Sequence, residues 1–192
     1  MTTEHHQALT GDEFDALFDG VLRSAFRYEG LPVYAVDEED ADLAAWRAGR
    51  AMAERSVRTD PWLTRIARQT IMDGVDWCRV RHVTSPPSWY VAWETAGYIE
   101  SQAAGERILL TGRRLWDGPD FWLLDGDTRR ARAVIQTYDA DGRWLRNELV
   151  PTGSRLVFEL ERVAAELMRV ATPLNQWLVE HRDELHAAGV RG

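Results

Sequence analysis

The sequence predicts an α+β fold in which an antiparallel meander sheet packs against N-terminal and C-terminal helices. Amphipathic helical patterns occupy both ends of the chain, and short strand-like segments separated by turns occupy the middle. A chain of 192 residues with 45% hydrophobic content can bury about 70% of its unfolded surface in one core. We therefore expect a single domain over residues 1–192, with a disordered segment at 1–9 and a helical segment at 153–190.

The first predicted helix begins with a capping box formed by Thr10 and Glu13. Apolar residues follow at the spacing of one buried helical stripe. They are Phe14, Leu17, Phe18, Val21, Leu22 and Ala25. Residues 26–36 are expected to be extended because they contain strand formers and a residue that precedes proline. A second helix is expected over residues 37–49.

Asp60 and Pro61 predict the N-cap and first turn of a third helix, which ends at Gly74. Residues 75–84 alternate in a way that predicts a strand with two distinct faces. One face would carry Trp77, Arg79, Arg81 and Val83, and the other Cys78, Val80 and His82. The next segment, 88–100, fits a helix or a strand, and the sequence leaves this choice open.

Three further strands are predicted at residues 107–111, 121–124 and 131–138. The turn residues Asp139–Gly142 predict a hairpin that leads into a fourth strand at 143–150. We expect these strands to form the antiparallel meander.

The C-terminal helix is expected to begin near Ser154 and to be interrupted at Pro173. Its apolar residues form a seam with alternating spacings of four and three. They are Leu156, Leu160, Val163, Leu167 and Val170. This seam could face the sheet or a second subunit, so a homodimer through the C-terminal helix is one expectation.

Composition excludes several classes of function. All 23 basic residues are Arg, so chemistry that needs a lysine is excluded. The net charge of −8 disfavours sequence-independent nucleic-acid binding. Cys78 is the single cysteine and is expected to be a small core residue rather than a nucleophile. The N-terminus lacks the apolar run of a signal peptide or membrane anchor, so we expect a cytoplasmic protein with no membrane segment.

No motif predicts a metal or a cofactor. The turn Asp139–Gly142 resembles the start of a calcium loop, but Val150 stands where such a loop needs a bidentate glutamate. His181 and His186 are five residues apart and would not share one face of a helix as metal ligands do. We therefore expect no metal site and no glycine-rich phosphate loop or dinucleotide fingerprint.

One candidate binding cluster combines the predicted strand at 75–84 with the segment that follows it. Arg79 and Arg81 would project from one strand face, where guanidinium groups need either solvent or an anionic partner. Tyr90 and Glu94 would share a face if their segment is helical. These four residues are candidates for binding a small anionic ligand. The alternative is an internal ion pair between Glu94 and one of the two arginines.

Arg27, Glu29 and Tyr34 form a second candidate cluster in the extended segment. Two opposite charges on one face of such a segment also fit a surface salt bridge, which would have no function in binding.

Several short segments together resemble the actinobacterial domain-of-unknown-function family 6879. They are Phe14–Phe18, Ser24–Glu29, Pro61–Leu63, Arg79–Arg81, Ala104–Glu106, Asp120–Asp125 and Tyr138–Arg143. The resemblance covers about residues 13–178 and departs from the family pattern at Ser85–Tyr90. It implies no assigned activity, but it implies gene neighbours that encode helix-turn-helix regulators and therefore a regulatory partner.

These features predict a noncatalytic ligand-sensing or protein-interaction module, with a helix-turn-helix regulator or a small anionic ligand as its partner. The alternative is a small enzyme of specialised metabolism. In that enzyme Arg79 and Arg81 would hold an anionic substrate while Glu94 or Tyr90 transfers a proton. The sequence leaves the choice between module and enzyme open.

Overall fold

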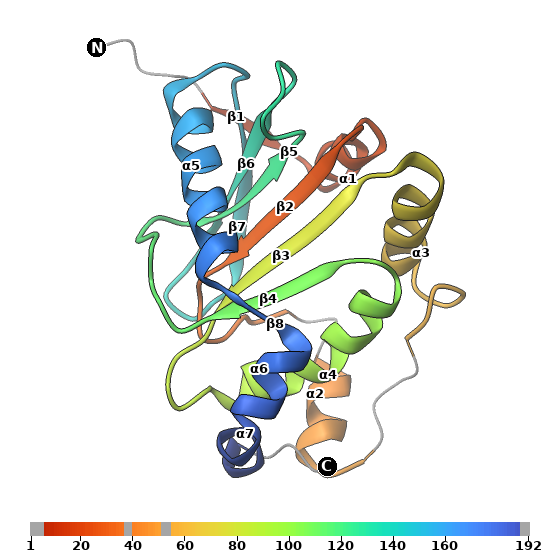
Figure 1. Cartoon of the computed structure of the whole chain (residues 1–192), viewed down its shortest axis with the longest axis vertical. Helices are drawn as coiled ribbons and strands as arrows, with labels where there is room; N and C mark the ends of the chain where they lie inside the picture. Colours follow the sequence, from red (N-terminus) through yellow and green to blue (C-terminus); the bar gives the residue numbers. More distant parts are fainter. Residues whose placement is uncertain (1–5, 37–39, 51–54, 189–192) are drawn as a thin grey trace.

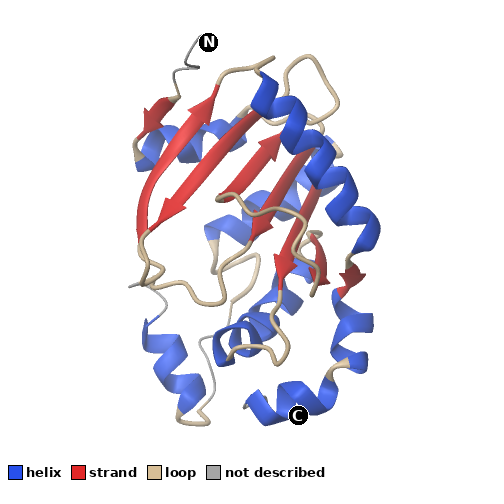
Figure 2. Ribbon diagram, turned by 90° about the vertical axis from the view of Figure 1, so that its left-hand side faces the viewer, coloured by secondary structure: helices blue, strands red, loops and turns tan. Residues whose placement is uncertain are grey.

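The computed structural model describes residues 6–36, 40–50 and 55–188. Their strands form one sheet of eight, in the order β1-β7-β6-β5-β2-β3-β4-β8 (Figures 1 and 2). The strands are β1 Gln7–Leu9, β2 Ser24–Glu29, β3 Asp76–His82, β4 Arg107–Thr111, β5 Asp120–Leu124, β6 Arg132–Tyr138, β7 Trp144–Val150 and β8 Thr172–Pro173. The α+β class predicted from the sequence is confirmed.

Helices cover both faces of this sheet. They are α1 Gly11–Asp19, α2 Asp40–Arg47, α3 Pro61–Arg68, α4 Trp89–Ala103, α5 Arg155–Val170, α6 Leu174–Glu180 and α7 Arg182–Ala188, with a π-helical turn, η2, at Gln69–Asp73. The long helix α5 crosses one face, while α1, α3 and α4 lie on the other (Figure 2). No helix in the described part of the chain is long and apolar enough to cross a membrane.

The sheet is mixed, and this corrects part of the predicted meander. Strands β5, β6 and β7 do pair antiparallel in sequence order. Strand β4 instead pairs in parallel with β3, which pairs in parallel with β2. Parallel neighbours need a crossover connection, and α3 and α4 supply the two crossovers. The undecided segment 88–100 is therefore helical, and it is the connection that removes β4 from the meander.

The N-terminal region differs from the sequence prediction in two places. Helix α1 has the predicted capping box, but it ends at Asp19. Ala25 therefore lies in β2 and not on a helical stripe. The sequence also predicted disorder over residues 1–9, whereas Gln7–Leu9 form β1 and pair with β7. Residues 1–5 lie outside the described residues.

The C-terminal seam faces the sheet of its own chain. Leu160 and Leu167 of α5 are fully buried in the same core as Phe26, Cys78 and Val80. This contact uses the surface that a dimer through the seam would need, so the seam itself gives no support to a homodimer.

Candidate functional site

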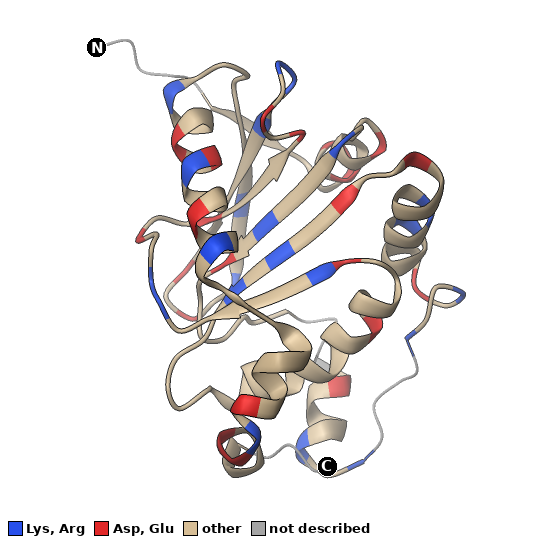
Figure 3. Cartoon of the chain, viewed as in Figure 1, with Lys and Arg blue, Asp and Glu red and all other residues tan. Residues whose placement is uncertain are grey.

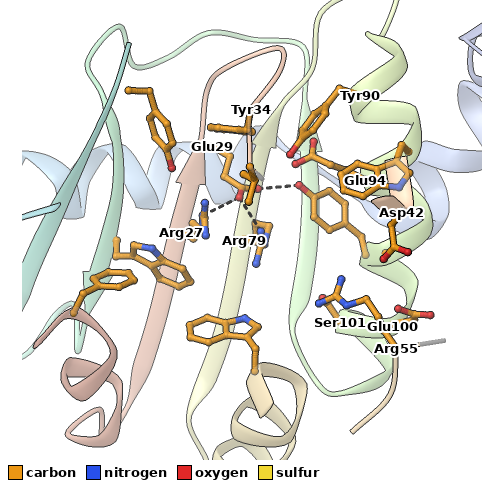
Figure 4. A pocket seen from close by; sticks show the side chains of 18 residues that line it. Arg27, Glu29, Tyr34, Asp42, Arg55, Arg79, Tyr90, Glu94, Glu100 and Ser101 are labelled. Atoms are coloured by element: carbon orange, nitrogen blue, oxygen red, sulfur yellow. Dashed lines mark hydrogen bonds and ion pairs between the residues drawn. The ribbon is translucent and has the colours of Figure 1, made fainter. Parts of the chain in front are cut away.

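A pocket of about 390 Å³ lies on the sheet face opposite α5, with a floor formed by β2, β3 and β5. Helix α4 forms one wall, and the segment after β2 lies across the pocket from the start of α3 (Figure 4). The lining residues are Phe14, Arg27, Glu29, Tyr34, Val36, Asp42, Arg55, Trp62, Arg79, Tyr90, Trp93, Glu94, Gly97, Tyr98, Glu100, Ser101, Trp122 and Tyr138. Both predicted clusters therefore meet at one site.

The parallel pairing of β2 with β3 brings the charged floor together. Arg27 is directly opposite Arg79, and Glu29 is opposite Arg81. All four side chains project from the same face because each is two residues from the next on its strand. Figure 3 shows the basic segments of β2 and β3 side by side in the middle of the sheet. This arrangement needs an in-register pairing that the sequence did not predict.

Glu29 is the centre of a buried ion network. Its Oε1 atom lies 2.8 Å from Nε of Arg27 and accepts a hydrogen bond of 2.8 Å from Nη1 of Arg79. Its Oε2 atom accepts a hydrogen bond of 2.8 Å from the Tyr98 hydroxyl. Arg79 also donates from Nε to Oε1 of Glu106 at 3.0 Å. Arg79 is thus held between two carboxylates, but its side chain still lines the pocket.

Arg81 is sealed beneath the pocket. Its side chain is 0% exposed, and its Nε and Nη2 atoms lie 2.9 and 2.8 Å from Oε2 of Glu94. Its Nη1 atom donates to the carbonyl oxygen of Leu31, and the guanidinium lies over the Tyr34 ring. Arg81 does not line the pocket. The internal ion pair, which was the alternative interpretation from the sequence, describes Arg81, whereas Arg79 retains access to the pocket.

The two glutamates of the site have opposite pKa shifts. Burial disfavours ionisation of Glu29, but the guanidinium groups of Arg27 and Arg79 outweigh it and lower the Glu29 pKa to about 2. Burial raises the pKa of Glu94 to about 7, and its single ion pair with Arg81 only partly offsets that effect. Glu29 is therefore a fixed negative charge, while Glu94 can exchange a proton near neutral pH.

Aspartate and tyrosine side chains hold the segment that closes one end of the pocket. The Tyr34 hydroxyl donates to Oδ2 of Asp120, whose Oδ1 atom accepts the backbone N–H of Gly30 at 2.8 Å. Burial raises the pKa of Asp120. Together with the bond from Arg81 to Leu31, these contacts fix the turn that follows β2.

Aromatic rings form much of the remaining wall. Trp122 of β5 lies beneath the Arg27 guanidinium, with 5.0 Å between Cζ and the ring centroid. Trp62 packs edge-to-face on Trp122 at 5.8 Å, and Tyr90 packs against Trp93 at 5.2 Å. The pocket therefore combines charged groups on the sheet with flat apolar surfaces around them. Such a combination is typical of small-molecule sites.

Comparison with known proteins identifies the family. A family model described as a domain of unknown function (DUF6879) matches residues 12–179. The chain belongs to this family. A search of curated proteins found no match.

Among solved structures, the DUF6879 chain is similar to TrmBL2, an archaeal chromatin protein whose structure was described as showing a novel mode of DNA binding. The TM-score is 0.45 at 11% identity, and the match covers 89% of this chain and 55% of that chain. The chain therefore matches about half the length of that protein, and a likeness this distant carries no information about function.

Several residues of the DUF6879 site were missed from the sequence. Glu106 and Asp120 are 1% and 3% exposed; Glu106 directly precedes β4, and Asp120 is the first residue of β5. Tyr98 is one turn after Glu94 on α4. Glu106, Ile108 and Leu110 are two residues apart, the spacing of one strand face. That pattern could have placed Glu106 on the same sheet face as Arg79. No comparable pattern connects Asp120 with Tyr34.

The described residues contain no group of three or more side chains able to hold a metal ion. Cys78 is buried at the opposite face of β3, and burial raises the pKa of its thiol to about 12. A thiolate nucleophile is therefore not available at neutral pH.

Proposed function

We propose that this DUF6879 chain is a noncatalytic ligand-sensing module that binds a small molecule in the pocket above β2 and β3. The observation that carries the proposal is a cavity of about 390 Å³ with a charged floor and aromatic walls. This volume is within the range of about 300–1,000 Å³ typical of small-molecule sites. An anionic group of the ligand would lie on Arg27 and Arg79, not on the sealed Arg81.

Gly97 offers a direct test because it lines the pocket from within α4. A Cβ atom at this position would have Nη1 of Arg55, the end of a flexible side chain, at 3.3 Å. Gly97→Leu should therefore occupy the pocket without damage to the fold, since glycine in a helix interior costs about 1 kcal/mol relative to alanine. Ala103→Leu adds the same side chain at an exposed position of α4 outside the pocket.

The experiment is a screen of small metabolites by thermal shift, followed by titration of the tryptophan fluorescence from Trp62, Trp93 and Trp122. A true pocket ligand should bind the wild type and Ala103→Leu equally, and should lose affinity for Gly97→Leu. Binding that is equal in all three proteins would show that the pocket is not the site. If no compound in the screen binds, the proposal has no support.

An enzyme acting on an anionic substrate is the second candidate, and one observation favours it. Glu94 lines the pocket with a pKa of about 7, which suits a general acid or base at neutral pH. The test is turnover of any ligand found in the screen. Chemical conversion that disappears in Glu94→Gln, with binding retained, would favour the enzyme over the module.

The regulatory partner is a separate proposal, supported by charge alone. The chain has a net charge of −8, which would favour association with a basic partner such as a helix-turn-helix regulator in the cytoplasm. Pull-down from cells that contain the native partner, at low and moderate salt, tests it. Failure to recover a DNA-binding protein under both conditions would contradict this proposal and leave the pocket proposal intact.

A further inference from the structure

The floor of the pocket presents hydrogen-bond donors that the protein leaves unused. The Arg27 guanidinium makes an ion pair with Glu29 through Nε and lies over the Trp122 ring, and within the described residues its two Nη atoms make no hydrogen bond or ion pair. Arg79 uses Nε and Nη1 for Glu106 and Glu29, which leaves its Nη2 atom without a described partner. Two guanidinium groups directly opposite each other on neighbouring strands can hold a carboxylate by several charge-assisted bonds.

The wall formed by α4 presents an acceptor in the same pocket. Both contacts of Glu94 with Arg81 use Oε2, and no described residue donates a hydrogen bond to Oε1. Figure 4 shows the Glu94 carboxylate directed from α4 toward the charged side chains of the strands. A ligand bound above Arg27 and Arg79 would therefore face a carboxylate on its other side.

The balance of charge selects against a ligand with a net charge. The pocket is lined by Arg27, Arg55 and Arg79 but also by Glu29, Asp42, Glu94 and Glu100. Glu29 and Glu106 already neutralise much of the positive charge of the floor. A simple anion would accept hydrogen bonds from the arginines but would be repelled by Glu94. A simple cation would be attracted by Glu94 but would be repelled by the arginines. A molecule with both charges avoids either penalty.

We propose that the pocket binds a zwitterion of amino-acid type. Its carboxylate lies on Arg27 and Arg79, its ammonium group lies on Oε1 of Glu94, and its apolar or aromatic body lies against the surrounding indole rings. This inference rests on the proposed ligand-binding function and names the class of ligand.

The experiment compares three probes that share one phenyl body. L-Phenylalanine carries both charges, 3-phenylpropionate carries only the carboxylate, and phenethylamine carries only the ammonium group. Isothermal titration should show that L-phenylalanine binds more tightly than either analogue by about tenfold or more. Arg27→Gln should abolish its advantage over phenethylamine, and Glu94→Gln should abolish its advantage over 3-phenylpropionate.

Tightest binding by 3-phenylpropionate would overturn the zwitterion in favour of an anion, and tightest binding by phenethylamine would overturn it in favour of a cation. Absence of binding by all three probes would overturn it as well. In each case another ligand that loses affinity for Gly97→Leu but not for Ala103→Leu would keep the proposed function. If Glu94→Gln does not fold, the probe series and Arg27→Gln still decide the result.

Discussion

The two faces of the central strands differ in chemistry although both are formed by alternating residues of the same short segments. Beneath α5, the side chains of Phe26, Tyr28 and Val80 pack into an apolar core. On the opposite face the intervening positions carry Arg27, Glu29, Arg79 and Arg81. The period of two in a strand thus lets one segment build a core and a polar pocket at once. Stability and binding should therefore respond to different positions of the same strands.

The largest expected effect is the loss of one half of the sealed ion pair. Arg81→Met leaves Glu94 without its counter-charge, and breaking a buried pair in this way costs about 3–5 kcal/mol. Urea denaturation of the variant should show this loss in the free energy of unfolding. The double variant Arg81→Met/Glu94→Leu removes both charges and should recover most of the stability. A loss below about 1 kcal/mol in the single variant would show that the pair is not effectively buried.

The apolar face should respond through packing alone. Leu160→Ala in α5 removes a fully buried side chain and should lower the free energy of unfolding by about 2–5 kcal/mol. The affinity of any pocket ligand should remain unchanged, since α5 lies on the opposite side of the sheet. Phe158→Ala on the same helix, where Phe158 is 57% exposed, should change stability by less than about 0.5 kcal/mol. Loss of ligand affinity in folded Leu160→Ala would contradict the separation of the two faces.

The sequence predicted the two faces of β3 correctly, because alternation between Trp77–Arg79–Arg81 and Cys78–Val80 is a local property. It also predicted the capping box of α1, the N-cap of α3 and the hairpin between β6 and β7 from local patterns. The parallel neighbours were missed, since pairing of β2 with β3 depends on crossovers that the sequence left undecided at 88–100. Strand pairing across distant segments cannot be read from one segment.

The candidate site was predicted in part for the same reason. Arg79, Glu94, Arg27 and Glu29 were selected, but they were assigned to two clusters because their strands were not known to be adjacent. Arg81 was expected to be equivalent to Arg79. The two arginines differ because the Arg81 side chain is fully buried and Arg79 still lines the pocket. That burial depends on how α4 packs on the sheet, which the sequence does not show.

The pH dependence of stability should distinguish the two glutamates. The Glu94 pKa is about 7 in the folded protein against an ordinary value of 4.5, so the unfolded state loses its proton first. The free energy of unfolding should therefore decrease as pH rises from 4.5 to about 7. Glu29, with a folded pKa of about 2, acts in the opposite direction and loses its contribution as pH falls below 4.5. The effect of Glu94 is limited to a few kcal/mol.

Glu94→Gln isolates the contribution of Glu94. The charges of Arg81, Arg79 and Glu29 also act on Glu94, and His82, whose pKa is lowered by burial, adds a pH dependence of its own. The quantity to compare is therefore the free energy of unfolding of the wild type minus that of the variant at each pH. This difference should slope downward between pH 4.5 and about 7. A flat difference would mean that Arg81 keeps Glu94 ionised throughout, and would remove the support for Glu94 as a proton donor or acceptor.

The smallest expected effect on stability is the one that matters most for binding. Arg27 is less enclosed than Arg81, with 20% of its side chain exposed, and Glu29 keeps Arg79 and Tyr98 as partners when Arg27 is replaced. Arg27→Gln should therefore lower the free energy of unfolding by only about 1 kcal/mol. It should nevertheless weaken a carboxylate-bearing pocket ligand by about tenfold or more, because a charge-assisted contact is lost. Arg65→Gln is the control, since Arg65 pairs with Asp15 outside the pocket. If Arg27→Gln destabilised the chain as much as Arg81→Met, Arg27 would be a structural ion-pair member, and the pocket floor would offer no separate recognition group.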